Sequence, residues 1–277
     1  MTVKMIKFLS LFFAAATFTT PAFAESDVTD ELLDLSGVKV MLHAVPELMR
    51  QEFRTIEASD KRRATEPPGQ YDAIVLESFQ FDNLFPVIYK TVNDNLDPDT
   101  APAIRAILRD PLANKIIKLE DLGFISNKKE IDSFSTALKA HGASGERLRL
   151  IKTLDESKQT TETALTVKLE LRTAYNRVFH PVPPEEKEGE ADKTAKLTSE
   201  LREKLEEPTR QEVEFAYLHF YRTVTNGELA RYVNLYQADE VSALNRLIAE
   251  GFLNAVGAAI DRMAEKLAKA APEKKKS

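Results

Sequence analysis

The side chains that could carry chemistry in this sequence are few and widely separated. Its four histidines, His43, His141, His180 and His219, include no H-E-x-x-H pair and no other metal-ligand spacing. His141 and His180 end predicted helices, where an imidazolium complements the helix dipole. His43 and His219 lie beside apolar stripes. We predict structural roles for all four and no zinc site.

Glu77-Ser78 resembles the Glu-Ser entry of lytic transglycosylases, in which a glutamate acts as general acid. The Gly-Leu-Met-Gln-like stretch that positions the sugar in those enzymes is missing from the sequence. Cysteine, the Gly-x-Ser-x-Gly motif, a glycine-rich phosphate loop and a calcium loop are missing as well. We therefore predict that Glu77 is an exposed helix residue, and we assign no catalytic, cofactor-binding or metal-binding residue.

Aromatic side chains crowd two neighbouring predicted helices near the C-terminus, at Tyr217, Phe220, Tyr221, Tyr232 and Tyr236. Such a group could line a groove for a lipid tail, a peptide or a partner helix. Aromatic residues at helical spacing belong more often to a packed interior, and no convergent polar groups specify a ligand here. The sequence favours core positions for them.

The first 24 residues are typical of a secretory signal peptide. Lys4 and Lys7 lie near the start of the chain, and an apolar stretch covers 8–18. Ala22-Phe23-Ala24 then offers small residues for cleavage after Ala24. Cleavage leaves 253 residues and lowers the formal net charge from -6 to -8, because both lysines leave with the leader. An acidic chain without a later run of roughly 20 apolar residues argues against nucleic-acid binding and an integral membrane span. We predict a periplasmic location.

Apolar residues at helical spacing, scarce glycine and the lack of period-two alternation predict an all-α fold. A helical region over 28–57 carries a stripe from Val28 to Phe53, with Pro46 able to kink or divide it. Further helices are predicted over 71–95, after the caps Asp97 and Asp110, from 127 to 141, from 144, and over 164–178. A long apolar stripe over 241–267 would indicate dimerisation if it lacked a partner.

The predicted organisation of the chain has six parts: a signal peptide (1–24), an N-terminal helical repeat (25–142), a helical connection that begins the second repeat (143–180), a charged linker (181–208), a C-terminal hairpin (209–271) and a basic tail (272–277). The linker is rich in Pro, Glu and Lys, so we expect a flexible segment with a transient helix. Whether the repeats form one domain or two stays open.

An internal duplication is indicated by the match of 89–94 (Tyr-Lys-Thr-Val-Asn-Asp) with 221–226 (Tyr-Arg-Thr-Val-Thr-Asn). Each segment precedes a short helix and then a longer one that closes on Gly123-Phe124 or Gly251-Phe252. Upstream, 31–42 has a looser counterpart in 146–154. The pattern predicts two related helical repeats packed around one core.

Three segments also resemble the secreted helical domain-of-unknown-function family 2059. They are 33–37 (Leu-Asp-Leu-Ser-Gly), 103–116 with Leu-Arg-Asp-Pro-Leu-Ala-Asn-Lys at 108–115, and 227–237. Leu108, Asp110 and Ala113 depart from the tyrosine, serine and glycine of the family pattern, and Ala238-Asp239 lacks its proline. The resemblance implies a helical fold and export, and it carries no activity.

These observations predict a non-catalytic exported helical protein that serves the cell envelope as an interaction or structural module. Its partner would be an envelope protein or an apolar ligand. The alternative is a carrier or holdase that shelters apolar ligands or unfolded chains between the repeats, motivated by the aromatic group. A peptidoglycan-active enzyme ranks third.

Overall fold

The computed structural model describes residues 27–124, 128–181 and 190–270, except the side chains of Phe124 and of 190–195. Within these ranges the chain forms helices and no strand, which confirms the all-α class. The first half contains α1 (Val28–Leu35), α2 (Val38–Ser59), α3 (Asp72–Ser78), α4 (Phe81–Asn95), α5 (Ala101–Leu108), α6 (Pro111–Phe124) and α7 (Lys128–His141), with short 3-10 turns at Lys61–Arg63 and Pro98–Thr100. The second half contains α8 (Gly145–Lys158), α9 (Thr160–Phe179), α10 (Glu190–Phe220), α11 (Asn226–Tyr236) and α12 (Asp239–Ala270).

Several predicted helix boundaries are confirmed by their capping bonds. The side chain of Asp97 accepts the backbone amide of Asp99, and that of Asp110 accepts the amide of Leu112 at 2.8 Å. Gly142 takes the left-handed conformation (φ 67°) directly after α7, as a helix C-terminus favours. Local polar and glycine signals therefore locate these ends correctly.

Two predicted helices are each divided in the structure. The region 28–57 breaks at Ser36-Gly37 and not at Pro46, because Gly37 adopts a positive φ of 80° while α2 continues through the proline. The region 71–95 breaks at Phe79-Gln80, between α3 and α4. Each of these two predictions therefore joined two helices into one.

The charged linker prediction is wrong from Glu190 onward, and residues 182–189 of it lie outside the described residues. Helix α10 begins at Glu190 and runs through Pro208 to Phe220. It lies against α9, where Leu201 and Leu205 are half-buried and Arg202 pairs with Glu162 at 2.6 Å. Tertiary packing supplies the burial that the composition of this segment lacks.

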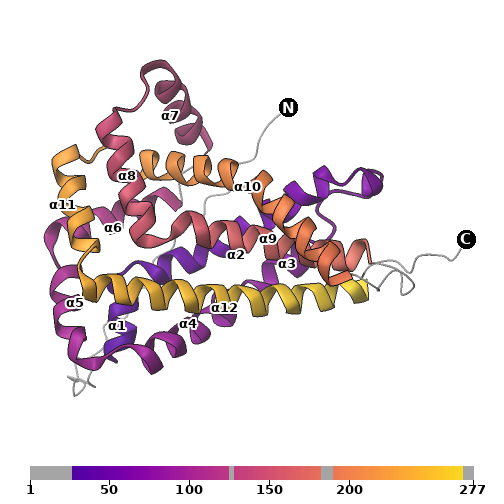
Figure 1. Ribbon diagram of the computed structural model, residues 1–277, viewed down its shortest axis with the longest axis horizontal. Coiled ribbons are helices and arrows are strands. Elements are labelled where there is room, and N and C mark those ends of the chain that lie inside the picture. Colours follow the sequence, from indigo (N-terminus) through magenta and orange to yellow (C-terminus); the bar gives the residue numbers. More distant parts are fainter. Residues whose placement is uncertain (1–26, 125–127, 182–189, 271–277) are drawn as a thin grey trace, which may run out of the picture.

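The long helix α12 organises the core. It runs the length of the molecule beside α4 and α9 (Figure 1). Its predicted stripe is buried at Val241, Leu244, Ala259, Met263 and Leu267, so the stripe has partners within the chain. Two apolar clusters result, one around α4, α9 and α12 and a second around α8, α10 and α11.

The helix pairings of one half recur in the other. Helix α12 contacts α4 as α6 contacts α10, and α1 contacts α5 as α8 contacts α11. Gly251 of α12 lies against Ile88 of α4, and Gly123 of α6 lies against the ring of Phe220 of α10. Ile88 and Phe220 each directly precede one of the matched sequence segments. These contacts support the predicted duplication, which remains a prediction.

Candidate functional site

A charged pair lies inside the second apolar cluster, surrounded by tyrosines. Lys158 Nζ of α8 lies 2.7 Å from Glu120 Oε1 of α6, and the two side chains are 15% and 13% exposed. The hydroxyls of Tyr221 and Tyr232 donate to the same carboxylate oxygen over 2.6 and 3.0 Å. The ammonium also lies 4.5 Å from the ring centroid of Tyr236. We call this group the tyrosine cluster: Glu120, Lys158, Tyr217, Tyr221, Tyr232 and Tyr236.

The electrostatics of the tyrosine cluster keep its lysine charged. Burial opposes the charge of Lys158, but the carboxylate of Glu120 outweighs burial and the pKa of Lys158 is raised. Burial, followed by the Glu120 charge, raises the pKa values of Tyr221 and Tyr232 well above the usual 10.0. A nucleophilic lysine needs a lowered pKa. The cluster therefore presents no activated amine. Its role is to connect α6, α8, α10 and α11.

The aromatic residues singled out in the sequence are core residues, as predicted. Tyr217, Phe220, Tyr221, Tyr232 and Tyr236 are all buried. Tyr217 directs its hydroxyl to Thr160 Oγ1 at 2.5 Å, and its ring stacks on that of Tyr221. The aromatic side chains that motivated the carrier alternative therefore pack against other side chains of the same chain.

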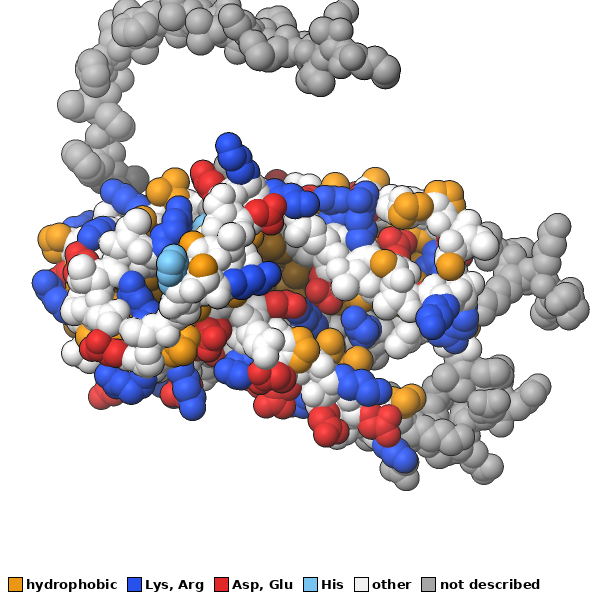
Figure 2. Space-filling model, turned by 90° about the horizontal axis from the view of Figure 1, so that it is seen from above, with side chains coloured by type: hydrophobic (Ala, Val, Ile, Leu, Met, Phe, Trp, Pro, Cys, Tyr) orange, Lys and Arg blue, Asp and Glu red, His pale blue; other side chains and the backbone are white. Residues whose placement is uncertain are grey.

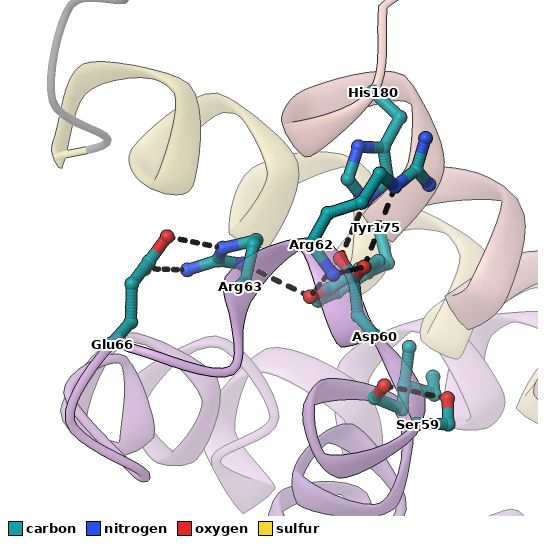
Figure 3. Close-up of polar contacts among 8 residues, drawn as sticks. Ser59, Asp60, Arg62, Arg63, Glu66, Tyr175 and His180 are labelled. Atoms are coloured by element: carbon teal, nitrogen blue, oxygen red, sulfur yellow. Dashed lines mark hydrogen bonds and ion pairs between the residues drawn. The ribbon is translucent and has the colours of Figure 1, made fainter.

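A second polar group ties the end of α2 to the end of α9 (Figure 3). Asp60 Oδ2 accepts a hydrogen bond from Tyr175 Oη at 3.1 Å and contacts His180 Nε2. Arg63 Nη1 donates to the same tyrosine hydroxyl at 3.1 Å, and Arg63 forms an ion pair with Glu66. We call these five residues the Asp60 latch.

The Asp60 latch has the residue types of an acid–base site but the bonding of a structural tie. Burial opposes the charge of Asp60, but hydrogen bonds from His180, the backbone and Tyr175 outweigh it and lower the pKa of Asp60. Burial raises the pKa of Tyr175 to about 12. Ser59 donates to the carbonyl oxygen of Ile56 at 2.7 Å, so its hydroxyl is directed away from His180. The His180–Asp60 pair therefore lacks the contact with Ser59 that a Ser-His-Asp site would need.

The other candidate side chains belong to neither group. Glu77, on α3, is 68% exposed and pairs with Lys266 at 2.9 Å, so the prediction of an exposed helix residue is confirmed. His141 is exposed at the end of α7. His43 is exposed on α2, and His219 is buried on α10. These four residues lie on four different helices.

A continuous aromatic ladder follows the seam between α2 and α4. The ring of His43 stacks on Phe81 at 4.6 Å, Phe81 stacks on Phe85 at 5.0 Å, and Tyr89 continues the series at 6.1 Å. Lys39 Nζ lies 5.5 Å from the centroid of Phe85. Phe81, Phe85 and Tyr89 are half-buried and pack against the first apolar cluster, and His43 is exposed, so the ladder lies at the border of core and surface.

Exposed aliphatic side chains occur on the helices that carry or adjoin this ladder. Among the described residues six large hydrophobic side chains are exposed, and three of them, Val28 (43%), Val40 (39%) and Leu48 (43%), lie on α1 and α2. Val28 was predicted to belong to the buried stripe, but α1 turns it to solvent beside Asp27, whose carboxylate accepts the hydroxyl of Tyr89. Leu48 lies five residues beyond His43, about 140° around the helix, and so belongs to the other flank of α2. We call the combined surface the aromatic face: Val28, Val40, His43, Phe81, Phe85 and Tyr89.

Carboxylates gather at the Tyr89 end of the aromatic face. Asp34, Asp30 and Asp94 are 70%, 47% and 45% exposed. Two of these carboxylates are paired: Asp30 with Lys39, which is 26% exposed, at 2.9 Å, and Asp94 with Lys90, which is 77% exposed. Farther along α2, Arg50 pairs with Glu47 and Asp72. The face is therefore apolar along its length and acidic at one end.

The face of the molecule that carries α7 lacks such a concentration (Figure 2). Figure 2 shows acidic and basic side chains interspersed over the face that carries α7, with hydrophobic ones in small separate groups. Among the described residues no helix has the length and apolarity of a membrane span, and no group of three or more His, Asp or Glu side chains could hold a metal ion.

The sequence reasoning missed the Glu120–Lys158 pair and the Asp60 latch. Their members lie 38 and 120 residues apart in the chain, so no local spacing joins them. The ladder had a local signal, because Phe81, Phe85 and Tyr89 recur every four residues on one helix face. No protein-family model, curated protein or solved structure matches this chain.

Proposed function

We propose that this chain is an exported, non-catalytic interaction module of the bacterial cell envelope, and that it binds its partner through the aromatic face. The observation that carries the proposal is an aromatic ladder with the exposed side chains of Val28 and Val40 beside it. Contiguous exposed apolar surface with a polar rim is typical of protein interaction sites. Export to the periplasm rests on the leader sequence.

The chemistry of the face specifies the kind of partner. A helix or strand with apolar side chains would cover the ladder, and a lysine or arginine at one end would meet Asp30 and Asp34. Aromatic residues are enriched among the side chains that dominate binding energy. The proposed partner is therefore an envelope protein with an apolar, basic-ended segment.

The test is native mass spectrometry of the mature chain extracted gently from the periplasm. Val40→Glu places a charge in the face, whereas Leu197→Glu places the same charge at a 65% exposed position on α10. We expect the wild type and Leu197→Glu to retain the same added protein mass and Val40→Glu to lose it. Equal retention by both variants, or no added mass on the wild type, would overturn the proposal.

A further inference from the structure

Helix α7 is attached to the body as an outlying element. It projects from the rest of the molecule (Figure 1) and has no buried residue. Its contact with the second apolar cluster comes from the half-buried side chains Phe134 and Leu138. It ends at Gly142, where an added Cβ would meet nothing within 4 Å. A free glycine at this position can absorb a rotation of the helix.

The surface beneath α7 contains a buried histidine. His219 is 3% exposed, and its ring meets that of Phe134 edge-to-face at 5.1 Å. Phe134 also contacts Phe215, one turn earlier on α10, at 5.5 Å. The buried Nε2 atom of His219 has no hydrogen-bond partner. An added proton on this ring would therefore place a charge among aromatic rings without an acceptor at that atom.

Two charged groups act on the ring of His219. Arg222, two residues beyond α10, donates to the carbonyl oxygen of His219 at 2.8 Å and disfavours a second positive charge. Glu130 of α7 favours the charge. Burial is the largest effect, and together with Arg222 it outweighs Glu130, so the pKa of His219 is lowered from 6.5.

We propose that α7 is an acid-released flap: protonation of His219 expels Phe134 from its contact with α10, and the helix separates from α10 to uncover the surface of Phe215 and His219. The closed state holds the neutral ring, and the open state exposes the ring to water. Because the histidine pKa is lower in the closed state, closure is favoured above about pH 6.5 and weakens as the pH falls below it.

The test is hydrogen exchange measured by mass spectrometry on the full chain, with rates corrected for the intrinsic effect of pH. Linkage allows the opening of α7 to increase by up to about tenfold for each pH unit below the normal histidine pKa, until the closed-state pKa is reached. We expect amides of Lys128–His141 to lose protection between pH 7.5 and 5 while amides of α12 keep theirs.

Two variants separate His219 from other acid effects. His219→Phe keeps an aromatic ring and removes titration, so α7 should stay protected at pH 5; His219→Gln serves the same purpose if the larger ring unfolds the protein. His141→Gln, at an exposed position of α7, should behave as wild type. Constant α7 protection in the wild type, loss of protection that α12 shares, or unchanged pH dependence in both His219 variants would overturn the proposal.

Discussion

Replacing Lys158 by methionine should destabilise the protein severely. The change keeps an unbranched side chain, one atom shorter, but removes the ammonium that holds Glu120 Oε1 at 2.7 Å and Oε2 at 2.9 Å. Tyr221 and Tyr232 remain as donors to one carboxylate oxygen only. Removing one partner of a buried pair costs about 3–5 kcal/mol, and the remaining exposure of this pair reduces the expected loss to about 2–4 kcal/mol.

The assay is urea unfolding followed by circular dichroism. Lys152→Met is the matched control, because Lys152 is 76% exposed on the same helix and lies 3.9 Å from Glu156. Its effect should stay within about 0.5 kcal/mol. The double variant Lys158→Met/Glu120→Gln should recover part of the loss, since the buried carboxylate of Glu120 is removed as well. A Lys158→Met protein as stable as the control, or a double variant less stable than the single one, would refute this reasoning.

Two further predictions concern the packing of the helices. Asp60→Asn should lower the free energy of unfolding by about 1–3 kcal/mol near neutral pH, because the charged acceptor of His180 is lost. Since the pKa of Asp60 is lowered on folding, its contribution is present above about pH 4 and is lost as the pH falls through the folded-state value; the difference between variant and wild type should therefore shrink in acid, and a constant difference would contradict it. Gly123→Ala should cost about 1–3 kcal/mol, because the new methyl group meets the ring of Phe220. Gly227→Ala faces open space and should stay within about 0.5 kcal/mol; equal effects in thermal unfolding would show that Gly123 is not a close-packing position.

The sequence predicted the fold class and many helix ends because these depend on local signals. Apolar periodicity marked the stripe of α12, and single polar residues such as Asp97 and Asp110 marked helix starts. It could not predict that α10 extends back to Glu190, because that helix is stabilised by its contact with α9. Composition alone favoured a linker there.

The polar groups of the interior were beyond sequence reasoning for the same reason. Glu120 and Lys158 resemble any other charged residues on amphipathic helices until α6 and α8 are placed together. The aromatic face was not predicted because Val28 was assigned to the buried stripe of 28–57. In the structure Val28 lies on the exposed side of α1. A break at Gly37 changes which side chains share a face.

The central claim is that the aromatic face binds an envelope partner, and site-specific photo-crosslinking in exporting cells tests it most directly. A photoreactive residue at Val40 should give one discrete adduct of higher mass, and the same residue at Leu197 should not. The adduct should weaken when Asp30 and Asp34 are both changed to asparagine, because the basic end of the partner loses its counter-charge. Identical adducts at both positions, or none at Val40, would contradict the account.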